Sequence, residues 1–185
     1  MNITIVSGSP RPNSVTVRVA RYLQNELDKQ YPGHHIRLVD VRSWPLGMLE
    51  NVWGSPAETP EEFRPLTEIM FTTQAFIIVT PEYNGSYTPA MKNLFDHFPK
   101  QSRKVFGLVT ASPGAMGGMR AAMQLQQMVA AFFGILSPHM LITPAVDKKF
   151  NENAELIEEN FQRMVNNFLH EFMWLAEQVN LEVPA

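Results

Sequence analysis

Short apolar runs rich in β-branched residues alternate along the chain with longer stretches in which apolar residues recur every three or four positions. Several short runs lack in–out alternation, which indicates strands buried on both faces. The short runs predict five strands, at Ile3–Ser7, His35–Val39, Ala75–Thr80, Lys104–Thr110 and Met140–Thr143. The longer stretches predict five helices, at Val15–Gln30, Glu61–Thr73, Pro89–Phe98, Gly118–Phe133 and Ala154–Val179.

The order of these elements predicts an α/β fold with a parallel sheet. Helix-sized segments separate successive strands, and a parallel return needs such a crossover whereas a hairpin does not. The pair Asn84-Gly85, a common hairpin signal, lies between a strand and a helix. The length of 185 residues suits one domain, residues 1–185, without repeats or a linker.

The last predicted helix has the clearest pattern. Three-and-four spacing predicts one buried face made of Ile157, Phe161, Met164, Val165, Phe168, Leu169, Phe172, Leu175, Ala176 and Val179. Met173 and Trp174 fall off this stripe, and we expect them to be exposed or to meet a partner. The connection Val41–Pro60 is longer than compact domains usually keep and is too apolar for disorder, which favours a lid or a binding loop.

Composition narrows the possible functions. The net charge of −3 and the absence of cysteine argue against nucleic-acid binding, thiolate metal sites and cysteine nucleophiles. No apolar run approaches the ~20 residues of a membrane span. Strand-like sequence begins at Asn2, which leaves no room for a leader, so we expect a cytoplasmic protein. The five histidines lack metal-ligand spacing, and we expect no metal.

Ligands of open parallel sheets bind beyond the carboxyl ends of the strands, so the loop after the first strand is a candidate site. Residues 7–14 (SGSPRPNS) lead into a helix whose free N–H groups favour an anion such as a terminal phosphate. Ser9, Arg11, Ser14 and Thr16 add possible donors. Alternatively, Asn13 or Ser14 simply caps the helix. The loop matches neither a dinucleotide fingerprint nor a P-loop.

The loops after the third and fourth strands carry aromatic residues and glycines. Residues 81–89 (PEYNGSYTP) offer Tyr83 and Tyr87 beside Asn84-Gly85, which suits either a flat conjugated ligand or an ordinary turn. Residues 111–118 (ASPGAMGG) bring three glycines that permit close backbone approach. Arg120 is either a surface charge or a ligand contact.

Together, residues 8–14 (GSPRPNS), 81–86 (PEYNGS) with 91–96 (MKNLFD), and 112–121 (SPGAMGGMRA) resemble the motifs of the NADPH-dependent FMN reductases. This family includes quinone, azo-dye and chromate reductases, and the resemblance spans roughly residues 1–145. It implies a flavodoxin-like three-layer sandwich, with helices on both faces of a five-stranded parallel sheet of order 2-1-3-4-5. One departure is His97-Phe98, where many relatives carry a tryptophan.

By this resemblance the cofactor is FMN, and NADPH or NADH is the electron donor. The FMN phosphate would be surrounded by Ser9, Arg11, Asn13, Ser14 and Thr16. The isoalloxazine ring would be lined by Pro81, Glu82, Tyr83, Asn84 and Gly85. Its pyrimidine edge would be approached by Ser112, Gly114 and Gly117. The chemistry would lie on the flavin, and no side chain is expected to be catalytic.

The implied activity is transfer of hydride from NADPH through FMN to a small acceptor such as a quinone, azo dye, chromate or free flavin, with ping-pong kinetics. The resemblance also implies a homodimer or homotetramer, and the surplus of apolar residues in Gly118–Phe133 predicts an interface made by that helix and Pro89–Phe98. The alternatives are a flavodoxin-type electron carrier and a flavin-binding regulator. Carriers tend to be strongly acidic, so the mild net charge favours the reductase.

Overall fold

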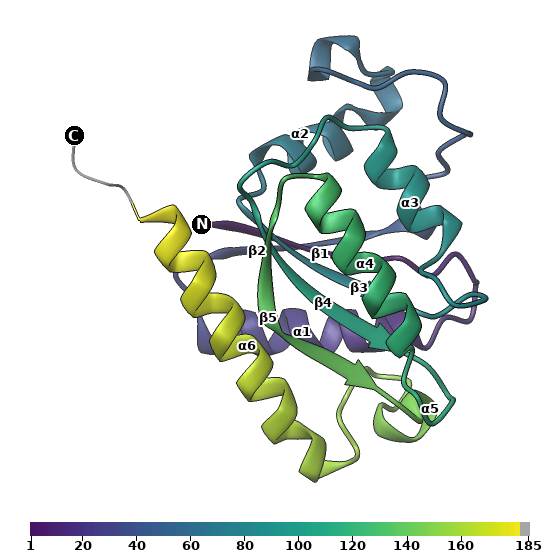
Figure 1. Cartoon of the computed structure of the whole chain (residues 1–185), viewed down its shortest axis with the longest axis vertical. Coiled ribbons are helices and arrows are strands. Elements are labelled where there is room, and N and C mark those ends of the chain that lie inside the picture. Colours follow the sequence, from purple (N-terminus) through teal and green to yellow (C-terminus); the bar gives the residue numbers. More distant parts are fainter. Residues whose placement is uncertain (182–185) are drawn as a thin grey trace.

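The computed structural model describes residues 1–181 and has three layers, with a parallel sheet between two layers of helices (Figure 1). The strands are β1 (Asn2–Ser7), β2 (His35–Asp40), β3 (Ala75–Thr80), β4 (Val105–Ala111) and β5 (Ile135–Thr143). They lie in the order β2-β1-β3-β4-β5, and every neighbouring pair is parallel. The predicted flavodoxin-like topology is therefore confirmed.

Two helical layers cover the sheet. The helices α1 (Thr16–Gln30) and α6 (Glu159–Asn180) pack on one face. The opposite face carries α2 (Arg64–Thr72), α3 (Pro89–Asp96) and α4 (Met119–Ala131). The short α5 (Val146–Lys149) and three 3-10 turns, η1 (Val41–Ser43), η2 (Pro56–Glu58) and η3 (Glu61–Phe63), complete the elements. Within residues 1–181, none of the helices has the length and apolar character that crossing a bilayer requires.

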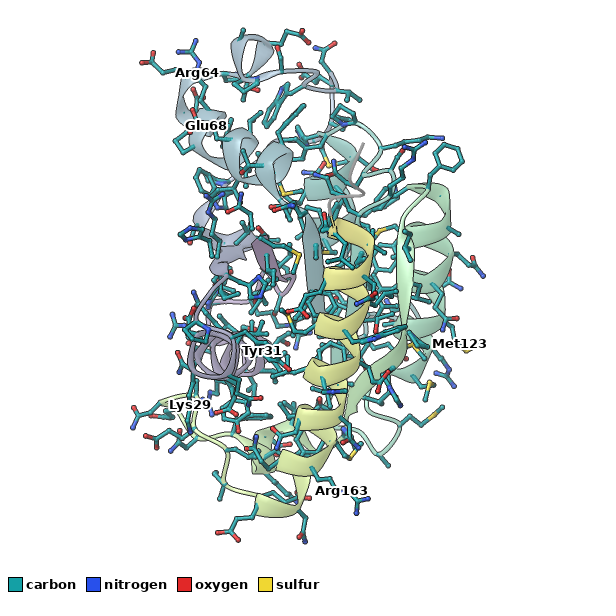
Figure 2. All side chains as sticks on the ribbon, turned by 90° about the vertical axis from the view of Figure 1, so that its left-hand side faces the viewer. Lys29, Tyr31, Arg64, Glu68, Met123 and Arg163 are labelled. Carbon is teal, nitrogen blue, oxygen red and sulfur yellow. The ribbon has the colours of Figure 1, made fainter. Side chains whose placement is uncertain are left out.

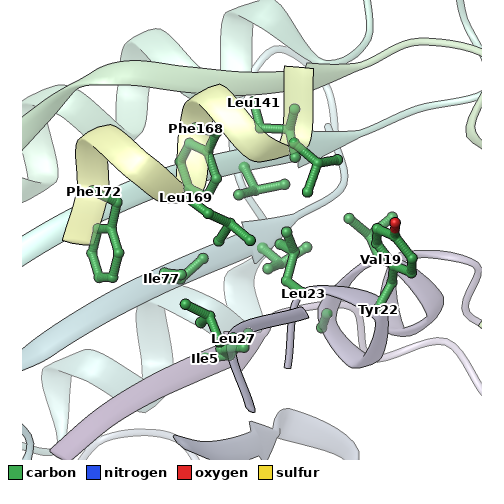
Figure 3. Packing of buried hydrophobic residues seen from close by; sticks show 14 of the residues in the cluster. Ile5, Val19, Tyr22, Leu23, Leu27, Ile77, Leu141, Phe168, Leu169 and Phe172 are labelled. Atoms are coloured by element: carbon green, nitrogen blue, oxygen red, sulfur yellow. The ribbon is translucent and has the colours of Figure 1, made fainter. Parts of the chain in front are cut away.

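Between the sheet and the helices α1 and α6, aliphatic and aromatic side chains pack into one hydrophobic core (Figure 3). Ile5 and Ile77 of the sheet meet Leu23 of α1 and Phe168 of α6, all at most 2% exposed. Burying one such side chain stabilises the fold by about 1.5–3 kcal/mol. Gly107 of β4 is required here, because an added Cβ would lie 2.9 Å from the rings of Phe168 and Phe172.

The last helix begins later than predicted, at Glu159 rather than Ala154. The Asn151 side chain accepts hydrogen bonds from the backbone N–H groups of Asn153 and Glu155, at 3.0 and 2.9 Å, and Ala154 has a φ of 61°. These local bonds hold a turn in place of a helical start.

The predicted buried face of this helix needs correction at several positions. Ile157 lies outside α6 and is 58% exposed, and Met164 and Val179 are exposed as well. Met173 is buried, because it lies four residues after Leu169 and three before Ala176 and so shares their face. The exposed Trp174 agrees with the prediction.

The fifth strand begins five residues before its predicted start at Met140. Pro138 and His139 interrupt the apolar run, and the pairing of β5 with β4 shifts register between Phe106 and Leu108. Proline is tolerated at this position because β5 is an edge strand, so its missing N–H removes no ladder bond from a central pair.

The long connection after β2 is folded against the body of the protein. Its Trp53 is 8% exposed, and the indole stacks on the Phe63 ring with 5.4 Å between the ring centroids. The Trp53 backbone N–H donates to the His97 carbonyl at 2.8 Å. The Asn93 side-chain amide donates to the Gly47 carbonyl at 2.8 Å. These contacts hold the connection against α3 and the residues that follow it.

Candidate functional site

The loop between β1 and α1 presents unpaired polar groups at the amino end of a helix. Val15 is the N-cap residue of α1, and no side chain among residues 1–181 accepts a hydrogen bond from the first turn. The alternative that Asn13 or Ser14 caps this helix is therefore wrong. Ser14 is 8% exposed, and its Oγ is buried without a partner among the described residues. A hydroxyl and free helix-terminal amides are donors of the kind that bind anions, and we refer to this part of the loop as the corner at the start of α1.

A second orphan hydroxyl lies close by in the sequence, on the last residue of β1. The Oγ of Ser7 is buried and lacks a partner among residues 1–181. A buried polar group without a partner costs free energy, about 1–3 kcal/mol, unless a ligand or water satisfies it. Ser9 and Thr16, predicted as phosphate contacts, are also buried, whereas Arg11 and Asn13 are exposed.

This first loop is tied to the loop that follows β3. The Gly8 N–H donates to the Val79 carbonyl at 2.8 Å, and the Thr88 hydroxyl donates to the Gly8 carbonyl. Thr88 also caps α3 by accepting from the Met91 N–H at 3.1 Å. One threonine thus fixes the first loop relative to α3.

The second loop contains a tight two-residue turn. The backbones of Tyr83 and Ser86 exchange hydrogen bonds of 2.8 and 3.1 Å, and Asn84 and Gly85 have φ values of 51° and 84°. These angles are typical of a type I′ turn, for which Asn-Gly is the preferred pair. The turn interpretation of Asn84-Gly85 is therefore confirmed, and it places Tyr83 where the Arg11 guanidinium lies 5.0 Å from its ring centroid.

The third loop needs glycine mainly for its own packing. Gly117 and Gly118 have φ values of 62° and 86°. A Cβ on Gly117 would lie 2.6 Å from Ile142 Cγ2 and 2.8 Å from the Pro144 backbone nitrogen. The Gly117 carbonyl accepts from the Thr110 hydroxyl at 2.8 Å. Ser112 Oγ accepts from the Gly114 N–H at 3.1 Å, so this serine shapes the loop.

Arg120 links the second and third loops. Its Nη1 lies 3.7 Å from Glu82 Oε1, and its side chain is 64% exposed. An ion pair with so exposed an arginine contributes about 0–1 kcal/mol to stability, so it restrains the two loops only weakly. Of the two interpretations of Arg120, a surface ion pair describes its present contacts.

Tyr87, in the second loop, is a titrating side chain that is partly buried. Burial raises the pKa of Tyr87, so its hydroxyl stays protonated at neutral pH. Burial lowers the pKa of Lys104 to about 8, but this lysine precedes β4 at the opposite end of the sheet and donates to the Met70 carbonyl at 2.9 Å. No cluster of potential metal ligands occurs in the part of the chain that the structure describes. The site is suited to binding through backbone amides and hydroxyls.

Sequence motifs did not reveal a clamp on the first loop, formed by Arg42 and Asp40. Arg42 Nη1 donates to the Pro12 carbonyl at 2.8 Å, and Arg42 Nε donates to the Asp40 carboxylate at 3.0 and 3.1 Å. The hydrogen bond to Asp40 raises the pKa of Arg42. The contact spans thirty residues, and the only sequence signal is a charged pair at the end of a strand.

The resemblance to the FMN reductases places FMN at this loop, so replacing Arg42 with glutamine is expected to weaken FMN binding about tenfold, because the loop loses a charge-assisted hydrogen bond that fixes Pro12. Fluorescence titration of the flavin-free protein with FMN measures the change. Arg37→Gln is the matched control, since Arg37 lies in β2, which leads into η1 and Arg42, but donates to Thr72 Oγ1 at 2.9 Å. Equal FMN affinity in both variants would show that the clamp plays no part in binding.

The strand order and the three loops at one sheet edge define an α/β protein of the flavodoxin-like fold class. The model of the family described as NADPH-dependent FMN reductase matches residues 1–146. The chain belongs to this family of oxidoreductases, whose cofactors are FMN and NADPH or NADH, and both the family and the cofactor predictions are confirmed.

Curated relatives and solved structures agree with this placement. The chain is 28% identical to an NAD(P)H-dependent FMN reductase of Schizosaccharomyces pombe, over 87% of this chain and 92% of that protein. It is 28% identical to an FMN-dependent NADPH-azoreductase of Staphylococcus aureus, over 91% and 92% of the two chains. The fold matches the flavoenzyme FerB of Paracoccus denitrificans with a TM-score of 0.77, 20% identity and coverage of 96% and 97%.

Proposed function

We propose that this chain, as one domain of residues 1–185, is a cytoplasmic reductase that transfers electrons from NADPH or NADH through FMN to a small acceptor. Acceptors of the proposed kind are quinones, azo dyes, chromate and free flavin, and the kinetics are ping-pong. The observation that carries the proposal is the corner at the start of α1, where the first turn has no side-chain cap and the Ser14 hydroxyl is buried without a partner among residues 1–181. The mild net charge of −3 disfavours the flavodoxin-type carrier.

In this proposal each of the three loops contacts a different part of FMN. Ser9, Arg11, Asn13, Ser14 and Thr16 hold the phosphate, and the orphaned Ser14 hydroxyl gives that group a donor. Pro81, Glu82, Tyr83, Asn84 and Gly85 line the ring, and Ser112, Gly114 and Gly117 approach its pyrimidine edge. The pinned loops supply preorganised dipoles, which stabilise negative charge at that edge.

When bound, FMN supplies the redox chemistry, accepting hydride from the nicotinamide and passing electrons to the acceptor. The chain binds and orients the reactants. Donor and acceptor use the same exposed face of the site in turn, so one product leaves before the second substrate enters. Double-reciprocal plots of initial rate against NADPH concentration, at several fixed acceptor concentrations, are therefore expected to give parallel lines.

The experiment that tests the proposal is an absorption spectrum of the purified protein, followed by turnover of NADPH with 1,4-benzoquinone. A reductase is expected to show the flavin bands and steady consumption of NADPH. A carrier retains the flavin bands but consumes NADPH poorly. A protein that stays colourless and binds no added FMN in calorimetry would contradict the whole proposal.

We also propose a homodimer formed through α3 and α4. Met119, Met123 and Phe133 are 38%, 57% and 63% exposed, and Met123 projects from the outer side of α4 (Figure 2). A groove of about 420 Å³ lies between α3 and α4, lined among others by Phe95, Phe98, Met128 and Phe132. Exposed apolar surface of this extent commonly marks an interface.

The dimer proposal predicts that Met123→Glu shifts the protein to monomer, with the dimer dissociation constant raised about 100-fold, because an unpaired carboxylate would be buried. Sedimentation velocity over a concentration series measures this shift. Met164→Glu, at a 49% exposed methionine of α6, is the matched control and is expected to leave the dimer intact. A wild-type monomer at working concentration would overturn the proposal.

A further inference from the structure

A pocket of about 290 Å³ lies between the segment 41–48 and the first turns of α3. The segment contributes Trp44, Leu46 and Met48, and α3 contributes Pro89, Ala90 and Leu94. None of the residues that line the pocket carries an ionisable side chain. A ligand in this pocket is therefore neutral where it is enclosed, because a buried phosphate or carboxylate would lack a partner.

The pocket adjoins the proposed flavin site. Pro10, which precedes Arg11 in the first loop, is part of its lining. Pro89 and Ala90 begin α3 directly after Thr88, whose hydroxyl joins the second loop to the Gly8 carbonyl. A molecule that begins over the flavin loops can therefore extend into the pocket on the side of β2.

The wall formed by segment 41–48 is held in place before any ligand binds. Asp40 caps η1 by accepting from the Arg42 N–H at 3.0 Å, and the Leu46 N–H donates to the Trp44 carbonyl at 2.7 Å. Asn93 of α3 holds Gly47, as described above. A preformed wall lowers the ordering cost of binding.

We propose that this pocket is a subsite for the distal aromatic ring of an extended, uncharged acceptor. The volume of about 290 Å³ lies just below the ~300–1,000 Å³ range of small-molecule pockets, which suits a ring system rather than a peptide segment. Trp44 offers an indole for stacking against a ring, and the prolines add flat apolar surface. The nature of the ligand rests on the proposed reductase function.

The kinetic test compares 4-(dimethylamino)azobenzene, an extended neutral acceptor, with 1,4-benzoquinone, a single small ring. In Trp44→Ala the ratio of kcat/KM for the azo compound to that for the quinone is expected to fall about tenfold, because the distal ring loses its stacking partner. Val52→Ala, at a 52% exposed position of the same connection outside the pocket, is the control and is expected to keep the ratio. An unchanged ratio in Trp44→Ala would overturn the proposal.

A binding test separates the subsite from the reductase function. Equilibrium dialysis of the azo compound against the purified protein, without any nicotinamide, is expected to show about tenfold weaker binding in Trp44→Ala. Ala90→Phe, which fills the pocket from α3 while keeping Trp44, is expected to weaken binding similarly, and Trp44→Phe to retain most of it. Equal affinity in all four proteins would overturn the subsite even if turnover with benzoquinone stands. Pocket-dependent binding without turnover would support the subsite and contradict the reductase.

Discussion

Ser14→Asp protein is expected to purify without FMN, with its affinity for added FMN reduced at least about 100-fold. Among the described residues the Ser14 hydroxyl is buried without a partner at the amino end of α1, where the FMN phosphate is proposed to bind. A carboxylate about 5 Å from a phosphate repels it by about 3 kcal/mol at an effective dielectric constant of 20. Calorimetric titration with FMN measures the loss.

The same substitution is expected to preserve folding, which separates a binding role from a structural one. An acidic side chain near a helix amino end is favourable by about 0.3–1 kcal/mol, so the flavin-free variant should melt at or above the temperature of flavin-free wild type. Ser14→Ala is the companion variant, with affinity about tenfold lower because only a donor is lost. Wild-type FMN affinity in Ser14→Asp would show that the phosphate binds elsewhere.

Gly117→Ala is expected to lower the free energy of unfolding by about 2–5 kcal/mol and to displace the third loop. The new Cβ would lie 2.8 Å from the Pro144 backbone nitrogen and 2.6 Å from Ile142 Cγ2, at a residue with a φ of 62°. The backbone neighbour cannot rotate away as a side chain could. Urea unfolding of flavin-free protein isolates this effect from flavin binding.

The matched control for Gly117→Ala lies three residues earlier in the same loop. At Gly114 an added Cβ would meet only Ser112 Oγ, at 3.4 Å. Gly114→Ala is expected to change the free energy of unfolding by less than about 1 kcal/mol. If both variants lose stability equally, the loop tolerates no side chain for a reason other than the contacts of Gly117.

The sequence was most informative where one local property decided the structure. Both ends of β3 were predicted correctly, because Ala75–Thr80 is a continuous apolar and β-branched run that is buried along its whole length. Prediction was poorer where short-range signals competed. Because Pro138 interrupts the apolar run, the first half of β5 was not predicted. The start of α6 was predicted too early, because the Asn151 side chain stabilises a turn before it.

For the candidate site, too, some features could be predicted from the sequence and others could not. The position of its three loops could be predicted, because parallel strands bring their carboxyl ends to one edge of the sheet. The state of individual side chains could not. A serine before a helix is compatible with a cap or a ligand contact. Only the packed structure shows that the Ser14 hydroxyl is buried and has no partner within residues 1–181. Gly117 was predicted to approach the flavin, but its packing against Ile142 and Pro144 already requires glycine.

By itself the sequence determined the alternation of strands and helices, the flavodoxin-like topology and the reductase family, since these depend on local runs, spacing and short motifs. Tertiary structure alone decided the Arg42 clamp on Pro12, the Thr88 link to Gly8 and the apolar pocket beside Trp44. Each joins residues far apart in the chain, and a contact of this kind exists only after the sheet has placed both partners at the same edge.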